Sequence, residues 1–193
     1  MIMHVHACGA GLSGGGLRIV AFYEGNGPDD RGRSLDEILQ FDDDALERVH
    51  DFIQWLFPMR ERSGANPTAP RLDPAAIEAF RTRPQLRSAL LRSLDRMLRF
   101  YGLAWAGDDI VRGSTFVKRS MWLTPGNHNH LRLTRILISL RVLGEEEAAQ
   151  ALFRCLTQIA TEERRSGRTP ISTRTIRFWS DAARVPPFAD GTR

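Results

Sequence analysis

The chain has 193 residues, of which 42% are apolar and 26% are charged. This length and composition fit one domain with a substantial core and exclude the disordered class. No run of about 18 apolar residues is present, so no segment could span a bilayer as a helix. The first residues also lack the pattern of a secretory signal, and we expect a soluble, cytoplasmic protein.

The cysteines indicate the redox compartment of the protein, and the charge distribution bears on the ligands it could attract. Cys8 and Cys155 do not form a disulfide framework, which fits a reducing compartment. The net charge is +4, and Lys118 is the only lysine among 27 basic residues, a bias typical of a GC-rich genome. The excess lies in residues 127–193, which hold 11 basic and 7 acidic residues. This third of the chain is either a solvated basic surface or one that prefers anionic ligands.

The sequence predicts one domain between two tails. Residues 1–17 are rich in glycine and predict a flexible N-terminal tail, and residues 186–193 predict a C-terminal tail that begins at a proline pair. The domain is expected over residues 18–185. Near its start, residues 19–23 are predicted to form a lone extended segment on the surface.

The first two helices have clear starting signals. Ser34 and Glu37 form a capping box, in which each side chain satisfies a free backbone N–H. A second helix begins in the acidic cluster at 42–44 and runs to Phe57, before Pro58. Apolar residues recur along it at helical spacing and predict a buried face: Leu46, Val49, Ile53 and Phe57.

Asp73, followed by a proline, predicts the start of a short third helix. A longer helix begins at Pro84 and ends at Gly102, a C-capping residue. One of its faces is an apolar stripe, and the other carries Arg92, Arg96 and Arg99, which we expect to be solvated. Residues 103–125 lack periodicity and predict a long loop containing a short strand or turn.

The most apolar helix is predicted at 127–143, and its apolar residues surround most of its circumference. Such a helix belongs at the centre of a domain. Residues 145–163 and a last helix capped by Ser172 complete the prediction. The predicted fold is all-α, an irregular bundle of about six to seven helices around this central apolar helix.

The central helix carries one polar stripe, because His128, Arg132, Arg135 and Ser139 follow each other at helical spacing. At its start, residues 127–130 read Asn-His-Asn-His. Free N–H groups at a helix start, with arginines below them, suit a carboxylate or phosphate. Alternatively, Asn and His cap the helix while the arginines pair with acidic side chains of neighbouring helices.

His50 and Gln54 form a second polar stripe, one turn apart on the second helix and next to core positions. Since polar groups inside a core need partners, we predict that the two stripes face each other and form either a pocket or a structural network. Asp51 or Asp95 could neutralise the arginines. Aromatic side chains would supply the walls. The predicted ligand-binding residues are His50, Gln54, Trp55, Tyr101, Trp122, Asn127, His128, His130, Arg132 and Arg135.

Metal and cofactor chemistry find little support in the sequence. The pairs His4 with His6 and His128 with His130 lack the spacing of a zinc site, although His4, His6 and Cys8 could bind metal adventitiously. No serine or cysteine stands in a recognisable nucleophile setting. We therefore expect no metal site, no cofactor and no catalytic residue of a known type.

Two nine-residue stretches resemble the signatures of a known family, the opioid growth factor receptor domain. They are residues 50–58, HDFIQWLFP, and residues 129–137, NHLRLTRIL. Shorter matches in the right order at 22–23, 34–39, 80, 97–98 and 100–102 extend the resemblance over roughly residues 19–180. The chain resembles a compact, stand-alone member of bacterial type, without the long repetitive extension of the vertebrate receptors.

The resemblance implies a receptor-type domain and supplies no binding residues. Our leading hypothesis is a binding module for a small anionic molecule or short peptide. The alternative is an enzyme of unknown class that uses His50 or His128 as acid or base. The weakest alternative is a nucleic-acid binder that uses the arginine face of residues 92–99 and the basic last third.

Overall fold

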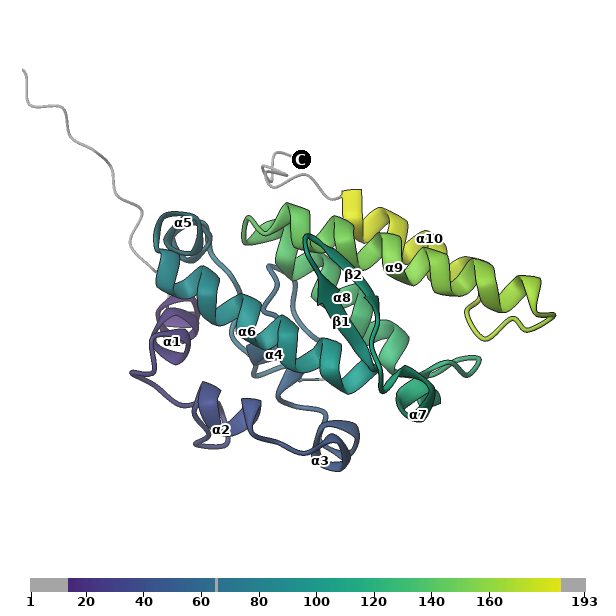
Figure 1. Ribbon diagram of the computed structural model, residues 1–193. Coiled ribbons are helices and arrows are strands. Elements are labelled where there is room, and N and C mark those ends of the chain that lie inside the picture. The colour runs from purple at the N-terminus through teal and green to yellow at the C-terminus, as the bar shows by residue number, and fades with distance from the viewer. Residues whose placement is uncertain (1–13, 65, 185–193) are drawn as a thin grey trace, which may run out of the picture.

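The computed structural model describes residues 14–64 and 66–184, and it confirms the all-α class (Figure 1). Within these residues lie ten α-helices, one 3-10 helix and one β-hairpin, more helices than expected because several are short. The helices are α1 (Gly14–Tyr23), α2 (Leu35–Leu39), α3 (Asp43–Arg48), α4 (Ile53–Leu56), α5 (Pro74–Thr82), α6 (Pro84–Tyr101), α7 (Phe116–Arg119), η1 (Ser120–Trp122), α8 (Asn129–Val142), α9 (Glu146–Arg165) and α10 (Thr173–Arg184).

The segment expected to be extended at residues 19–23 is helical, which corrects the prediction. It belongs to α1, which begins inside the stretch assigned to the N-terminal tail. Ile19, Phe22 and Tyr23 recur at helical spacing and are buried, and α1 packs on α5 and α6. Tertiary burial here overrides the strand preference of β-branched and aromatic residues. Residues 1–13 and the C-terminal tail lie outside the described residues.

The predicted helix boundaries with strong chemical signals are confirmed. Ser34 and Glu37 form both hydrogen bonds of the capping box at the start of α2. The Asp73 side chain accepts from the Ala76 N–H at the start of α5. Gly102 ends α6 with φ +73°, the left-handed conformation that glycine adopts readily.

The predicted helix at 42–57 is broken into α3 and α4, which is the main error in the predicted fold. Residues 49–52 are not helical, and Val49 is extended, with φ −86° and ψ 130°. In an unbroken helix the Leu46 and Val49 carbonyls would accept from backbone N–H groups four residues later. Here side-chain donors from α8 bond to these carbonyls instead.

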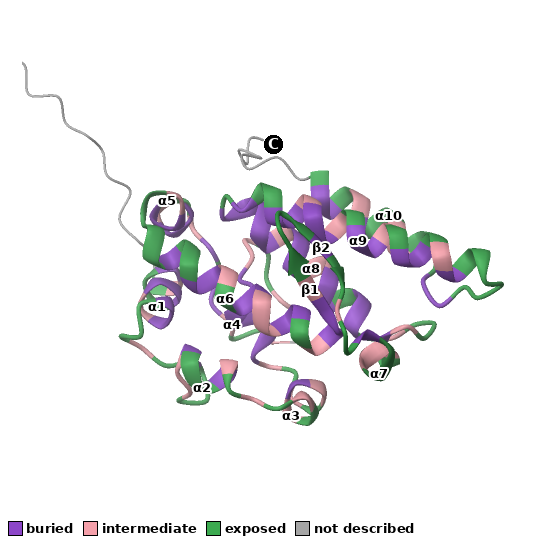
Figure 2. Cartoon of the chain, in the orientation of Figure 1, coloured by how far each residue is buried: buried purple, intermediate pink, exposed green. Residues whose placement is uncertain are grey.

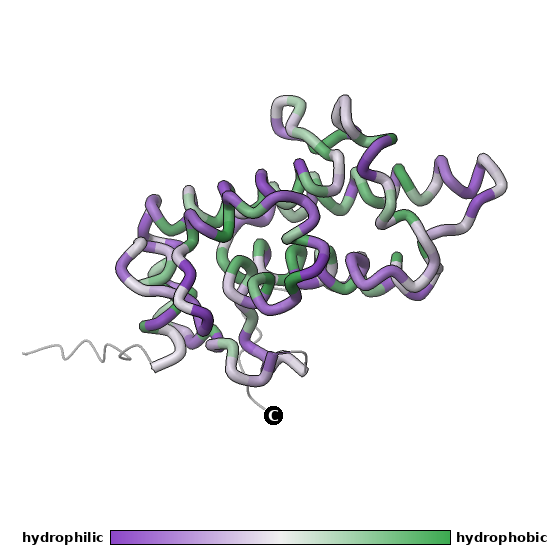
Figure 3. The backbone as a smooth tube through the Cα atoms, turned by 90° about the horizontal axis from the view of Figure 1, so that it is seen from below, coloured by the Kyte–Doolittle hydropathy of each residue, from purple (hydrophilic) through white to green (hydrophobic). Residues whose placement is uncertain are grey.

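The predicted central helix, α8, is confirmed as a core element. It packs against α9 and α10, and its buried residues occupy most of its length in the middle of the molecule (Figure 2). Leu133, Ile136, Leu137 and Leu140 are fully buried. The outer helices alternate between hydrophobic and hydrophilic residues, as amphipathic helices do (Figure 3).

Residues 103–122 are more regular than the predicted long loop. They form an antiparallel hairpin of β1 (Leu103–Ala106) and β2 (Asp109–Arg112), followed by α7 and η1. In its register, Leu103 pairs with Arg112 and Trp105 with Ile110. Ion pairs join β2 to α9, and the hairpin lies in front of α8 and α9 in Figure 1. None of the helices in the described part of the chain is long and apolar enough to cross a membrane.

Gly102 and Gly126 offer a matched test of this packing. Both have φ +73°, but a Cβ at Gly102 would lie 2.6 Å from the Phe116 Cα, whereas nothing lies within 4 Å of one at Gly126. Gly126→Ala should destabilise by about 1 kcal/mol through backbone strain alone. Gly102→Ala should cost roughly 2–4 kcal/mol, because the clash adds to the strain. Chemical denaturation measures both, and equal losses would contradict the packing of α7 against the end of α6.

Candidate functional site

Arg132, on the buried side of α8, joins this helix to the break between α3 and α4. Its Nη1 donates to the Leu46 carbonyl at 2.7 Å and to Asn129 Oδ1 at 3.3 Å. Its Nη2 donates to the Val49 carbonyl and to His50 Nδ1, both at 2.9 Å. The protein therefore uses all four terminal N–H groups. Burial lowers the pKa of the Arg132 guanidinium, which stays charged at neutral pH.

Arg135 and Ser139 continue the same row of donors along α8. Arg135 Nη1 donates to the Phe57 carbonyl at 3.1 Å, and Ser139 Oγ donates to the Pro58 carbonyl at 2.9 Å. Burial lowers the pKa of the Arg135 guanidinium as well. Unlike Arg132, Arg135 makes this single hydrogen bond among the described residues, so its Nη2 and Nε groups are free to bind a ligand.

His50 and His128 lie side by side next to Arg132, with ring centroids 5.2 Å apart and perpendicular planes. A guanidinium only donates, so His50 Nδ1 must accept from Arg132, and the neutral ring carries its proton on Nε2. His128 Nε2 lies 3.5 Å from Glu47 Oε1. Burial lowers the pKa of His128, Glu47 opposes this, and Arg132 and His50 lower the pKa further.

These side chains line one open cleft of about 420 Å³ between α8 and residues 50–64. Among the residues predicted from the sequence, the structure brings together His50, Gln54, His128, Arg132 and Arg135. The break before α4 does not separate His50 from Gln54. The Gln54 amide, oriented to match its neighbours, donates to the His50 and Asp51 carbonyls at 3.2 Å each. The remaining lining residues are Ile53, Met59, Arg62, Ser63, Gly64, Leu131, Thr134 and Ile138.

No carboxylate of the described chain contacts the two cleft arginines, although Glu47 acts on Arg132 and Glu61 on Arg135 at longer range. Asp51 pairs with arginines of the loop between α1 and α2, and Asp95 pairs with an arginine of its own helix. Among the described residues, no carboxylate oxygen lies within 4.0 Å of a guanidinium nitrogen of Arg132 or Arg135. Backbone carbonyls, which carry only partial charge, take the place of carboxylates. The cleft therefore attracts anions.

The three aromatic residues expected as walls do not line the cleft, which corrects that part of the prediction. Trp55 is buried in the core beside Phe22, with ring centroids 5.1 Å apart. Tyr101 and Trp122 pack against each other, and Trp122 Nε1 donates to the Tyr101 carbonyl at 3.1 Å. Their burial in the hydrophobic core keeps them out of this cleft, although Trp122 borders a separate pocket beside α3 and α7.

Asn127 and His130 also lie outside the cleft lining. Asn127 Oδ1 accepts from the Asn129 N–H at 2.9 Å and so caps the start of α8. His130 lies two residues from both His128 and Arg132, which places it on the opposite side of the helix. There its Nε2 bonds to the Trp122 carbonyl at 3.0 Å.

Sequence reasoning missed the aliphatic residues of the cleft. Met59 comes from the loop after α4, and a loop without periodicity gives no signal of its orientation. Leu131 is one of the apolar residues of the central helix, yet its exposed fraction is 70%. Ile138, seven residues later on the same side of α8, is only partly buried. These residues give the cleft an apolar edge.

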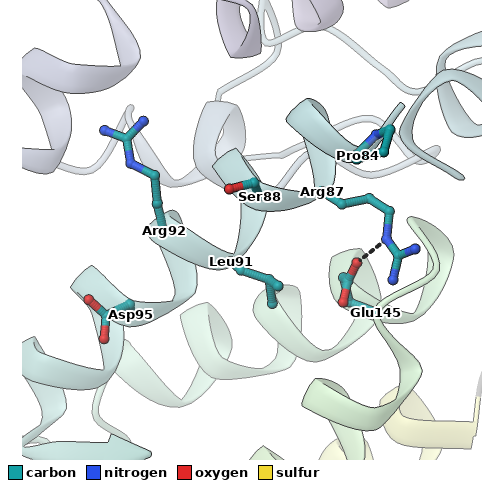
Figure 4. A pocket seen from close by; sticks show the side chains of 7 residues that line it. All are labelled: Pro84, Arg87, Ser88, Leu91, Arg92, Asp95 and Glu145. Atoms are coloured by element: carbon teal, nitrogen blue, oxygen red, sulfur yellow. Dashed lines mark hydrogen bonds and ion pairs between the residues drawn. The ribbon is translucent and has the colours of Figure 1, made fainter. Parts of the chain in front are cut away.

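A larger hollow of about 520 Å³ lies over α6 and the turn before α9, and its charges are paired (Figure 4). Arg87 forms an ion pair with Glu145, which Figure 4 marks with a dashed line. Arg92, Arg96 and Arg99, the face considered for nucleic acid, pair with carboxylates of α2, α3 and α6. This face therefore offers less free positive charge than its sequence suggests.

The described residues contain no group of three His, Cys, Asp or Glu side chains placed to hold a metal ion. The histidines at 4 and 6 and Cys8, considered for adventitious binding, lie outside that part of the chain. Cys155 is a buried free thiol on α9. Its burial raises the pKa to about 11, so it is a thiol rather than a thiolate at neutral pH.

Fold and cleft together define an all-helical domain with a basic surface cleft in the size range of small-ligand sites. The family model described as the opioid growth factor receptor (OGFr) conserved region matches residues 21–183. The chain therefore belongs to the opioid growth factor receptor family. Both walls of the cleft fall inside the matched region. No solved structure matches the chain.

Curated relatives agree with this assignment. The rat opioid growth factor receptor is 42% identical over 129 residues, which cover 64% of this chain and 22% of the relative. The mouse protein of the same name is 40% identical over 114 residues, or 58% of this chain and 18% of the relative. Mouse opioid growth factor receptor-like protein 1 is 34% identical over 137 residues, 68% and 29% respectively. The chain thus matches less than a third of each relative's length.

The different bonding of the two cleft arginines predicts different effects on stability. Arg132→Ala removes four hydrogen bonds, two of them to backbone carbonyls of the helix break, and should lower the free energy of unfolding by roughly 2–4 kcal/mol. Arg135→Ala removes one and should cost about 1 kcal/mol. Arg177→Ala, at an exposed position on α10, is the control. Urea denaturation measures all three, and an Arg132→Ala loss no larger than the control's would contradict the anchoring role.

Proposed function

We propose that the domain binds a small molecule or short peptide through an anionic group in the cleft between α8 and residues 50–64. The observation that carries this proposal is Arg135, whose Nη2 and Nε groups have no hydrogen-bond partner among the described residues, while Glu61 acts on its charge only at longer range. A planar guanidinium with free N–H groups suits a carboxylate or phosphate. A cytoplasmic location is part of the proposal.

The arrangement around Arg135 supports the same ligand chemistry. Arg132 adds a buried positive charge but no free terminal N–H, so it acts through charge and by holding His50. His50 keeps a proton on Nε2, a neutral donor next to His128. A cleft of about 420 Å³ with a few polar groups is typical of small-ligand sites. The relatives' names describe them as receptors, which agrees with a binding role.

The two alternatives receive less support. Nucleic-acid binding needs free cations along a face, and the arginines of α6 are paired. Catalysis by His50 would have to act through Nε2, because Arg132 occupies Nδ1. A binding role needs no proton transfer.

Arg135→Gln tests the proposal directly. Thermal-shift screening of the full chain with methanesulfonate, inorganic phosphate and a library of carboxylate- or phosphate-bearing metabolites and short peptides identifies binders, which stabilise by mass action. Calorimetry should then show a loss of about 10- to 100-fold in affinity for Arg135→Gln, the effect of losing a charged hydrogen bond. Arg177→Gln removes the same charge from α10 and should leave binding unchanged. Equal affinities in the two variants would refute an anion site at Arg135.

Binding should also depend on pH through His128. The pKa of His128 is lowered, so the ring is neutral at pH 7, and a bound anion favours its charged form. Binding of methanesulfonate, whose own charge is constant, should therefore strengthen as pH falls from 8 to 6, by at most about tenfold per pH unit. The groups facing His128 are Glu47, His50 and Arg132. His128→Gln should flatten the profile, and an unchanged slope in this variant would exclude His128 as its source.

A further inference from the structure

The cleft has an aliphatic edge that its charges do not explain. Ile53, Met59, Leu131 and Ile138 are among its lining residues, together with the basic side chains. Leu131 is the most exposed large apolar side chain on α8, at 70%. An exposed aliphatic edge beside a concave site is typical of a surface that a ligand covers.

Two of the aliphatic residues lie on α8, one on each side of Arg135 along the helix. Leu131 lies four residues before Arg135 and Ile138 three residues after it, so both are neighbours of the guanidinium on the helix surface. From His128 to Ile138 the helix rises about 15 Å. An anion held at Arg135 would therefore lie next to apolar side chains in either direction along the cleft.

The opposite wall runs parallel to α8, which gives the cleft two different ends. Arg132 bonds to Val49 and Ser139 bonds to Pro58, so residue numbers rise together along both walls. His50 consequently lies near His128 at the basic end. Met59 follows Pro58 and lies toward Ile138 at the other end.

The volume limits the size of the occupant. A cleft of about 420 Å³ lies in the size range of sites for small organic ligands. This is enough for a carboxylate with a medium-length aliphatic chain. A longer occupant would extend beyond the lining residues into solvent.

Building on the proposed function, we propose that this cleft takes an amphiphilic organic anion, a carboxylate with an unbranched aliphatic body. Arg135 binds the head, and Ile53, Met59, Leu131 and Ile138 cover the body. The chain then removes the exposed surface of Leu131 from water, while the head neutralises the free guanidinium. A terminal carboxylate on an apolar peptide would present similar chemistry, so the test includes one.

The experiment measures the affinity of the full chain for acetate, butyrate, hexanoate and octanoate by calorimetry at pH 7. Burial of one methylene contributes enough for about a fourfold gain, and the open cleft should give a two- to fourfold gain per methylene. Octanamide, which lacks the charge, should bind at least tenfold more weakly than octanoate. N-acetyl-leucine serves as the peptide-type carboxylate and should bind more weakly than octanoate.

Matched variants assign the two parts of the ligand. Leu131→Asn should leave acetate binding intact and reduce the gain per methylene, and because Leu131 is exposed, the fold should tolerate the change. Val117→Asn makes the same change at an 88% exposed position on α7 outside the cleft and should have no effect. Arg135→Gln should weaken acetate and octanoate by a similar factor.

The outcomes separate this inference from the proposed function. Anion binding that depends on Arg135 but not on chain length would overturn the aliphatic body and leave the anion site standing. Tighter binding of N-acetyl-leucine than of octanoate would overturn the aliphatic assignment in favour of a peptide carboxylate. If neither methanesulfonate, phosphate nor any carboxylate binds, both proposals fail together.

Discussion

The hydrogen bonds from Arg132 to the Leu46 and Val49 carbonyls are the constraint on which the rest of the site depends. A chain that leaves a helix must still satisfy its backbone polar groups, and buried carbonyls without partners are costly. Arg132 meets this need from another helix. Arg135 and Ser139 do the same for the Phe57 and Pro58 carbonyls, at the end of α4. The break between α3 and α4 is therefore stable, and the two walls of the cleft keep their register.

The choice of carbonyls rather than carboxylates as partners has an electrostatic consequence. A carboxylate would cancel the charge of each guanidinium, whereas a carbonyl accepts a hydrogen bond and leaves the net charge in place. The two arginines, three residues apart, therefore differ in how many of their donors the protein uses. Arg132 uses its terminal N–H groups to hold the fold, and Arg135 keeps most of its donors available at the cleft. The sequence presented a structural network and a pocket as alternatives, and here a hydrogen-bonded network lines an open cleft.

Local signals allowed much of the fold to be predicted. Ser34, Asp73 and Gly102 act on neighbouring backbone groups, so their effect is visible within a few residues of sequence. The break after Arg48 was not predictable in this way, because its cause is an arginine more than 80 residues away. The helix at α1 was missed for a related reason: its helical form depends on burial against α5 and α6 rather than on propensity.

The two stretches that carry the family resemblance, residues 50–58 and 129–137, each contribute lining residues to one wall of the cleft. The polar residues among apolar ones were enough to predict that His50 and Gln54 face Arg132 and Arg135, because polar groups in a core need partners, although His50 lies in the helix break. This pattern was not enough to place Trp55, Tyr101 and Trp122, since an aromatic residue next to a polar one in sequence can point the opposite way. The cleft has aliphatic walls as a result. This lining places charge, hydrogen-bond donors and aliphatic surface side by side in one cleft.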